Sequence, residues 1–189
     1  MQEKLAVALE RLAQAQRVML WEASAPLGLS PTQGLILLHL YRREPTARRV
    51  GVLAQTFNLT PATVSDAVRV LVAKGLLERK TGADRRIQEL ELTPQGLQHV
   101  QRLERWDAPL RQALQILTSE QQQSLYSLLL PLLAQLVDAQ VITVARMCLL
   151  CQYFQADLDQ YYCNLLHKPL TSGDLQIECP DFSPALARP

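Results

Sequence analysis

The chain has 189 residues, of which 48% are hydrophobic, and this is enough for one ordinary domain with a helical extension. Its formal net charge is +1, which excludes an overall field that draws the protein toward nucleic acid or a membrane surface. Any such attraction has to come from local clusters of charged residues.

The N-terminal segment, residues 3–22, has apolar residues at helical spacing, with Leu5, Leu9 and Leu12 on about one side. The pattern predicts an amphipathic helix and differs from the unbroken apolar core of a secretory signal. The longest apolar stretch, residues 125–137, is shorter than the ~18 residues typical of a membrane span. We therefore expect a cytoplasmic protein without a membrane segment.

Three helices are predicted next. Residues 31–41 form the first of them, and residues 50–58 give about two turns of the second. The third covers residues 61–74, where Thr60 is the expected N-cap and Gly75 the expected stop. The last two helices, with their short connection, have the form of a helix-turn-helix.

The periodicity changes over residues 76–93, which alternate imperfectly between apolar and polar residues around a turn-like centre. A β-hairpin fits this pattern best. Four cations crowd the hairpin: Arg79, Lys80, Arg85 and Arg86.

Helical spacing returns at Pro94, with a kink expected at Pro109. A final long helix is expected from Ser119 to about Leu150, bent at Pro131. Beyond it the balance of charge turns acidic, which marks a separate appendage. The sequence thus predicts a mostly helical fold with a small hairpin, a body over 1–147 and a tail over 148–189.

A helix-turn-helix followed by a basic hairpin is a winged helix, here centred on residues 48–96. In that fold the second helix enters the major groove, and the hairpin tip reaches the backbone or the minor groove. Each feature alone would also fit a well-capped helix or a solvated basic loop. Because the features follow one another in a complete docking unit, the order favours DNA binding.

The start of the second helix carries residue types suited to reading DNA. Thr63 and Ser65 supply short hydroxyl donors, Asp66 could accept from cytosine, and Arg69 is a long cationic arm. The free N–H groups at the same helix end favour a phosphate. We expect these side chains to lie at the DNA interface.

The stretch from Val50 to Gly96 resembles the core of MarR-family transcriptional regulators. The residues that carry the resemblance are Leu53, Ala54, Leu59, Thr63, Ser65, Leu71, Lys74, Gly75, Leu76, Arg79, Asp84, Arg86, Leu92, Thr93 and Gly96. With the flanking helices, the resemblance covers about residues 3–147. It implies a winged helix-turn-helix homodimer whose first and last helices make the dimer.

Matched residue by residue, the resemblance implies DNA contacts at Pro61, Thr63, Ser65, Asp66, Arg69, Arg85 and Arg86. Arg86 would enter the minor groove, Arg85 would be a spare cation, and Asp84 would hold the wing in shape. The family's small-molecule pocket has no motif to transfer. Trp21, His39 or Tyr41 could line it, although aromatic residues at helical spacing more often belong to a core or a dimer interface.

All four cysteines stand in the tail, at Cys148, Cys151, Cys163 and Cys179. One C-x2-C pair and two separate thiols make a complete shell for a soft metal. Free buried thiols and disulfides are the alternatives, and a reducing cytoplasm disfavours the disulfides. The residues therefore predict a metal centre.

Zinc and an iron–sulfur cluster both remain open as the occupant. Zinc is narrowly preferred, because a structural zinc ion folds short polar tails outright. Against zinc, the chain has a single C-x2-C pair, and Cys179-Pro180 is similar to the Cys-Pro that closes some cluster motifs. His167 could replace one cysteine as a ligand, though a lone histidine beside a charged loop is more often solvated.

We expect a transcriptional regulator that is not an enzyme and that acts as a repressor. It is expected to bind specific sequences of double-stranded DNA, as a homodimer on an inverted repeat. Redox state, a metal or a small molecule could modulate it. One alternative is a thiol redox protein that uses Cys148 and Cys151, although the motif is expected at the end of a helix, where the dipole disfavours a thiolate. Another is an architectural DNA-binding protein without an effector.

Overall fold

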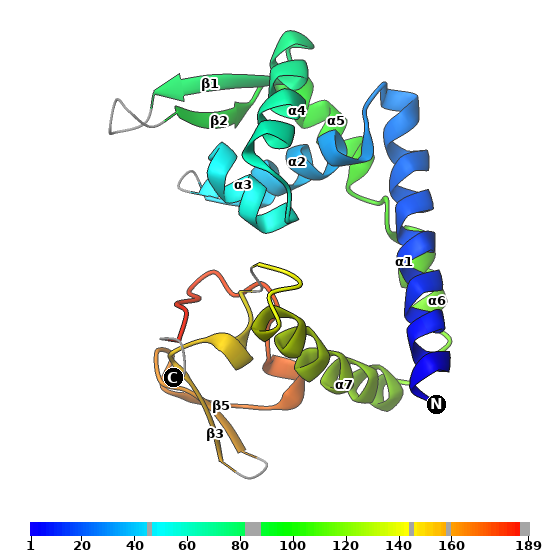
Figure 1. Ribbon diagram of the computed structural model, residues 1–189, viewed down its shortest axis with the longest axis vertical. Helices are drawn as coiled ribbons and strands as arrows, with labels where there is room; N and C mark the ends of the chain where they lie inside the picture. The colour runs from blue at the N-terminus through cyan, green and yellow to red at the C-terminus, as the bar shows by residue number, and fades with distance from the viewer. Residues whose placement is uncertain (45–46, 82–87, 144–145, 158–159, 186–189) are drawn as a thin grey trace. The chain divides into compact units, whose positions relative to one another are not determined.

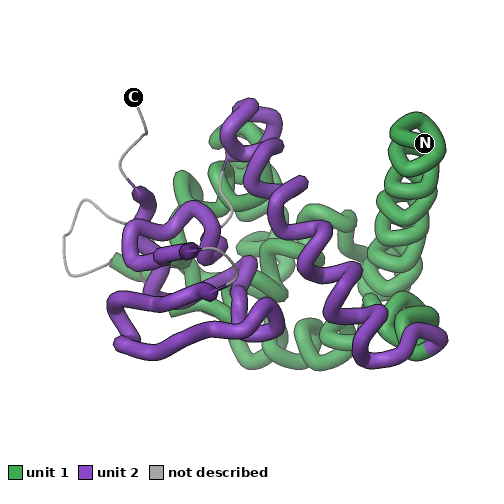
Figure 2. The backbone as a smooth tube through the Cα atoms, turned by 90° about the horizontal axis from the view of Figure 1, so that it is seen from below, with its two compact units in different colours: residues 1–115 green, residues 116–189 purple. Residues whose placement is uncertain are grey.

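The structure, a computed structural model, describes residues 1–44, 47–81, 88–143, 146–157 and 160–185. The chain divides into two compact units, residues 1–115 and residues 116–189, coloured green and purple in Figure 2. This division differs from the expected boundary after residue 147. The reason is that α7 (Ser119–Asp138) packs against the cysteine-bearing segment. Whether the functional division follows the same boundary stays a prediction.

The first unit is mostly helical and carries one small antiparallel sheet (Figure 1). Its elements are α1 (Gln2–Ser24), η1 (Ala25–Leu27), α2 (Pro31–Arg42), α3 (Val50–Phe57), α4 (Pro61–Ala73), β1 (Leu77–Thr81), β2 (Gln88–Leu92), α5 (Pro94–Leu103) and α6 (Ala108–Leu114). Helices α3 and α4 form the helix-turn-helix, and β1 and β2 form the wing. The predicted fold class is confirmed.

Three helices of this unit begin in the same way, with a hydroxyl residue followed by proline. Ser30, Thr60 and Thr93 accept hydrogen bonds from the backbone N–H three residues later, at 3.3, 3.1 and 3.0 Å. Proline then occupies the first helical position, where its missing N–H costs nothing. These starts were readable from the sequence because the signal lies entirely within a few neighbouring residues.

The core of the first unit gathers apolar side chains from α2 to α5 and from the wing. Its largest fully buried members are Ile36, Leu37, Leu40, Leu53, Val64, Val68, Leu71, Leu76, Leu90, Val100 and Leu103. Since α4 and β2 both contribute to this core, helix α4 and the wing are held in place by the same packed interior.

Gly96 lies where α5 passes the chain that leads into β1. A Cβ atom at this position would stand 2.1 Å from the carbonyl oxygen of Leu76. Thr93 fixes the same junction, since its hydroxyl donates to the carbonyl of Gly75 at 2.6 Å. Two residues of the MarR-like motif therefore serve the backbone geometry of the wing and not DNA contact.

We expect Gly96→Ala to lower the free energy of unfolding by about 1–3 kcal/mol, because the backbone of Leu76 has to shift to admit the methyl group. Denaturant unfolding of both proteins measures the difference. Gly51→Ala is the matched control, since a Cβ there meets nothing within 4 Å. Inside α3 that change should stabilise the protein by about 0.5–1 kcal/mol. Equal stability of the two variants would contradict the close approach at Gly96.

Two predicted helices end differently in the structure. The helix expected from Pro94 with a kink is two helices, α5 and α6, separated by residues 104–107. The last helix ends at Asp138 and does not reach Leu150. Gln140 takes the left-handed conformation with φ 58°. The N–H groups of Gln140 and Val141 then bond to the carbonyls of Val137 and Leu136, both at 2.9 Å, which is a Schellman ending.

The second unit places a small β-sheet after its long helix. Its elements are α7, η3 (Cys148–Leu150), β3 (Phe154–Asp157), β4 (Gln160–Cys163), β5 (Lys168–Leu170) and η4 (Ser172–Asp174). The strands follow one another in an antiparallel meander, β3-β4-β5. The sequence predicted only an appendage here. In the described part of the chain, no helix combines the length and the apolar character that crossing a membrane requires.

Helix α7 has two apolar faces. One face packs against the cysteine-bearing segment through Tyr126, Leu130, Leu133, Ala134 and Val137. The other face is exposed and consists of Leu125, Leu128, Leu132 and Leu136. The sequence assigned the whole leucine-rich stretch to a dimer, whereas the structure uses half of it inside the protomer.

Candidate nucleic-acid interface and the cysteine-lined hollow

Helix α4 separates its core side chains from its predicted DNA contacts. Val64, Val68 and Leu71 are fully buried, while Pro61, Thr63, Asp66 and Arg69 are exposed. Ser65 is half-buried. Four of the five predicted recognition positions thus share the outer side of the helix.

The N-terminal turn of α4 is organised by its cap. The hydroxyl oxygens of Thr60 and Thr63 lie 2.9 Å apart, and Thr60 also accepts from the Thr63 N–H. Each hydroxyl keeps further hydrogen-bonding capacity, since a hydroxyl has one donor and two acceptor sites. The remaining N–H groups of the first turn point outward along the helix axis and favour an anion there.

Asp66 and Arg69 form an ion pair on this outer side. The Asp66 Oδ1 and Arg69 Nη2 atoms are 2.9 Å apart, and both side chains are 72% exposed. An exposed pair of this kind contributes only about 0.3–0.5 kcal/mol, so it is readily exchanged for a contact to DNA. In the free protein the pair holds the guanidinium of Arg69 close to the helix.

The wing places its cations on different faces. Arg79 pairs with Leu90 and Lys80 with Glu89 across the two strands, so the pleat directs these cations to opposite sides. Lys80 donates to Glu91, and this hydrogen bond raises the pKa of Lys80, with Glu78 adding to the effect. Of the four cations counted in the hairpin, Lys80 is therefore paired with acidic neighbours on the wing itself.

The tip of the wing carries three of the predicted residues. Asp84, Arg85 and Arg86 lie outside the residues that the structure describes. Their roles in shaping the wing and in contacting DNA stay predictions.

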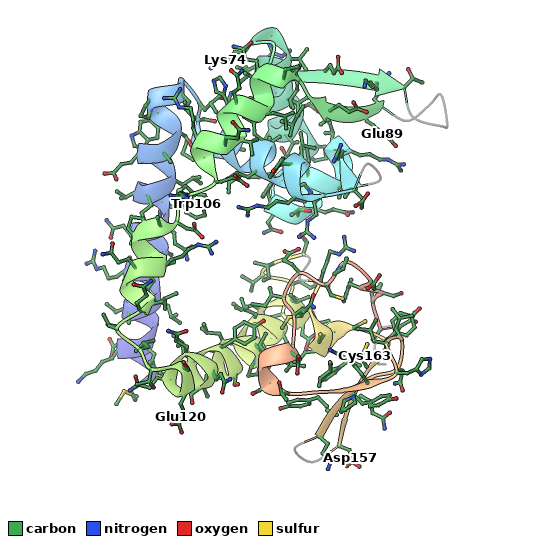
Figure 3. All side chains as sticks on the ribbon, turned by 180° about the vertical axis from the view of Figure 1, so that it is seen from behind. Lys74, Glu89, Trp106, Glu120, Asp157 and Cys163 are labelled. Atoms are coloured by element: carbon green, nitrogen blue, oxygen red, sulfur yellow. The ribbon has the colours of Figure 1, made fainter. Side chains whose placement is uncertain are left out.

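Two arginines that sequence reasoning missed brace the wing. The carbonyl of Arg48 accepts from the N–H of Leu90 on β2 at 2.9 Å. Arg49 stands 3.5 Å from Glu89 in an ion pair, and Figure 3 labels Glu89 on the wing strand. The sequence shows the two arginines directly before α3, but it does not show which strand they contact.

The three residues suggested for an effector pocket differ in their surroundings. His39 is half-buried and packs edge-on against the ring of Phe57, with centroids 5.6 Å apart. Trp21 and Tyr41 are exposed. The contact of His39 with Phe57 fits a residue that packs against its neighbours, which is the more common role of an aromatic residue at helical spacing.

The four cysteines line one hollow in the second unit. Its remaining walls are mainly apolar: Tyr153, Phe154, Leu165, Leu166, Leu170 and Asp181. Three separate parts of the chain bring the thiols together. Cys148 and Cys151 lie at the two ends of the η3 turn, Cys163 ends β4, and Cys179 follows from the C-terminal segment. Figure 3 labels Cys163 within this unit.

Backbone hydrogen bonds close the segments around the hollow. The N–H of Cys148 donates to Gln176 and the N–H of Cys179 donates to Arg146, at 3.0 and 2.9 Å. The N–H of Gln176 also donates to the sulfur of Cys148 at 3.3 Å. Burial raises the pKa of the Cys148 thiol, the Gln176 N–H opposes this, and the other three thiols add to the rise.

All four thiols are free and half-buried. In their present positions, the described side chains form no group of three or more His, Cys, Asp or Glu residues that could hold a metal ion. His167 is absent from the walls of the hollow.

The expected setting of the C-x2-C motif was wrong. Because α7 ends at Asp138, the motif does not lie at the end of a long helix but forms a short 3-10 turn. The described strands that follow are antiparallel to one another, so the motif does not open the helix of a βαβ unit. The thioredoxin-like alternative therefore lacks its structural context.

Comparisons with known proteins agree with this architecture. Residues 27–87 match the sequence profile of the MarR family. The DNA complex of MepR from S. aureus has 20% identity and a TM-score of 0.63, over 69% of this chain and 95% of that chain. At this identity the likeness concerns the fold alone.

Two further structures are somewhat nearer in sequence. The transcriptional regulator PA3341 has 28% identity and a TM-score of 0.62, over 71% of this chain and 98% of that chain. A MarR-family regulator from Silicibacter pomeroyi has 25% identity and a TM-score of 0.59, over 72% and 90%. No curated protein matched the chain.

These structures are covered almost completely, whereas more than a quarter of this chain has no counterpart in them. The matched part of this chain has the fold of the transcriptional regulator PA3341. Residues 27–87 therefore resemble the MarR family, whose members are DNA-binding transcriptional regulators and not enzymes, and the fold around them is that of a transcriptional regulator.

Proposed function

We propose that the protein is a sequence-specific transcriptional regulator that binds an inverted repeat of double-stranded DNA as a homodimer. The observation that carries this proposal is the outer side of α4, where Thr63, Asp66 and Arg69 are exposed next to a free helix N-terminus. Hydroxyl, carboxylate and guanidinium groups in this order can read base edges in the major groove. Repression is the proposed sign of regulation, since a dimer that covers its operator excludes other proteins from it.

Two helices support the homodimer. Helix α1 exposes Leu5, Leu9, Leu12, Val18 and Trp21, and α7 exposes the four leucines of its outer face. A second copy of the chain is the occupant that an apolar helix face of a winged-helix protein most simply takes, and a two-fold dimer fits a palindromic site. Half-sites would then lie about one helical turn, roughly 34 Å, apart. A small-molecule effector remains a further proposal from the MarR resemblance.

The function is tested at Arg69. On a duplex selected from a random pool, we expect Arg69→Ala to weaken binding about 5- to 150-fold, because one good side-chain contact to a base gives about 1–3 kcal/mol of discrimination. On unrelated DNA the loss should be much smaller. Fluorescence anisotropy with both duplexes measures the two affinities.

Arg111→Ala is the matched control for Arg69→Ala. Arg111 is 70% exposed and pairs with Asp107 at 2.9 Å, almost the same as the Arg69 pair. It lies on α6, outside the helix-turn-helix. If both variants lose affinity equally on both duplexes, α4 does not read sequence, and an architectural DNA-binding protein becomes the better description.

The wing is tested separately at Arg86. We expect Arg86→Ala to weaken binding to many sequences alike and to reduce the salt slope of log affinity by about one unit. Lys80→Ala is the comparison, because Lys80 is already held by Glu78 and Glu91 and should change the slope less. Anisotropy titrations at several salt concentrations give both slopes. An unchanged slope for Arg86→Ala would show that this arginine makes no phosphate or minor-groove contact.

A further inference from the structure

The wall of the hollow is wider than the ligand shell of one metal ion. Six other side chains share this wall with the four thiols. A zinc ion bound by four thiolates is surrounded by its ligands alone, at about 2.3 Å, and leaves no room for other side chains among them.

The positions of the sulfur atoms lead to the same conclusion. Tetrahedral ligands at about 2.3 Å from one ion would stand only about 3.8 Å from one another. The four cysteines, all within the described residues, line a common wall yet are not grouped as ligands of one ion. In a cubane cluster each thiolate binds its own iron, so the sulfurs surround a larger group and stand farther apart.

The walls of the hollow suit a cluster. Apart from Asp181 and the Tyr153 hydroxyl, the side chains between the thiols are hydrocarbon or aromatic: Phe154, Leu165, Leu166 and Leu170. An apolar wall limits water at a cluster, and backbone N–H groups that donate to ligand sulfurs tune it. The Gln176 N–H already makes such a bond to the sulfur of Cys148.

The second unit also has little core of its own. Among the residues that the structure describes, its buried apolar core consists of Leu130, Met147 and Leu175. Packing of this extent is small for a unit of 74 residues, residues 116–189. Small units of this kind are commonly held together by a bound metal centre, whose binding energy then becomes folding energy.

We propose that the hollow binds a [4Fe–4S] cluster through Cys148, Cys151, Cys163 and Cys179. The cluster occupies the space between the η3 turn, the end of β4 and the C-terminal segment, and it links the three. This inference concerns the second unit alone and does not depend on whether the first unit binds DNA.

The test uses the full-length protein under anaerobic conditions. The metal-free protein is incubated with ferric iron, sulfide and a thiol, which reduces half of the iron to the ferrous state that the cluster also contains, with an equal amount of zinc present as a competitor. We expect about four iron atoms and four sulfides per chain after desalting, with the brown colour and broad visible absorption of a cluster. A colourless protein that retains one zinc ion, or no metal at all, overturns the proposal.

Two variants assign the ligands. Cys163→Ser should lose most of the bound iron and sulfide, because one corner of the cluster loses its thiolate. His167→Asn should retain both in full, and asparagine tolerates the left-handed backbone of this residue, where φ is 51°. Loss of iron in His167→Asn, or full retention in Cys163→Ser, contradicts the assignment to four cysteines. Since the unaltered protein is tested first, a misfolded variant cannot hide a wrong proposal.

Discussion

Glutamate at both Leu128 and Leu132 is expected to split the proposed dimer into monomers. These leucines are 67% and 53% exposed in the single chain, so the change disturbs little packing within the protomer. Glutamate also keeps the helix, since its helix propensity is close to that of leucine. In a dimer the new carboxylates would be buried without partners, at a cost of several kcal/mol per charge. A rise of at least about a hundredfold in the dimer dissociation constant follows.

Analytical ultracentrifugation over a range of concentrations measures this shift. Gln123→Glu is the control, since it adds a charge at an exposed polar position on another side of α7. Circular dichroism should give the same helix content for all three proteins. A double variant that remains as dimeric as the control would remove α7 from the proposed interface.

Loss of the cluster is expected to change DNA affinity about 5- to 150-fold, which corresponds to the 1–3 kcal/mol typical of coupling between sites. This prediction combines the proposed cluster with the proposed dimer. The cysteine-bearing segment covers one face of α7 through Leu130, Leu133 and Val137. Without the cluster, the cysteine-bearing segment would no longer pack against that face. Helix α7, including the outer face proposed to make the dimer, would then lose this support. Anisotropy with iron-loaded and iron-free protein compares the two affinities.

His167→Asn, loaded with iron, is the control for this coupling, and Cys163→Ser should reproduce the iron-free result. Sedimentation of each sample shows whether the change passes through the dimer. If DNA affinity is the same with and without iron while iron is demonstrably lost, the second unit is a structural appendage. The test at Arg69 is independent, so DNA binding itself can stand when the coupling fails.

Helix starts in this protein and several helix ends could be predicted, whereas the end of the last helix could not. Three helix starts are marked by a capping residue that is directly followed by proline; the caps are Ser30, Thr60 and Thr93. The end of α7 rests on Gln140 in a left-handed conformation, for which glycine or asparagine is the usual residue. Sequence rules therefore extended the helix to Leu150, and this error placed the C-x2-C motif in the wrong setting.

The same limit applies to the leucines of α7. Their spacing showed that the helix is apolar on a broad face. It did not show that part of this face packs within the protomer and part is exposed. Half of it covers residues far along the chain, such as Leu170, Leu175 and Ile177. A truncation after Leu150 would therefore expose Leu130 and its neighbours. Pairing between distant segments is not encoded in local periodicity.

The cysteines illustrate what spacing can and cannot predict. Their confinement to 32 positions indicated one common site, and the structure lines one hollow with all four. The spacing of the cysteines did not decide between zinc and a cluster, because both can take four cysteine ligands. The apolar side chains that share the wall of the hollow with the thiols are brought there by the folded chain, and they favour the larger occupant.

The order in which the hollow is assembled has a consequence for how the protein is made. The bonds that close it join Cys148 to Gln176 and Leu150 to Ala185, so the site exists only once residue 185 has left the ribosome. Seventy residues separate Gln115 from Ala185. At about 5–20 residues per second, the first unit has roughly 4–14 seconds in which to fold alone. Every new molecule would then carry a finished DNA-reading unit before its thiols can receive a cluster.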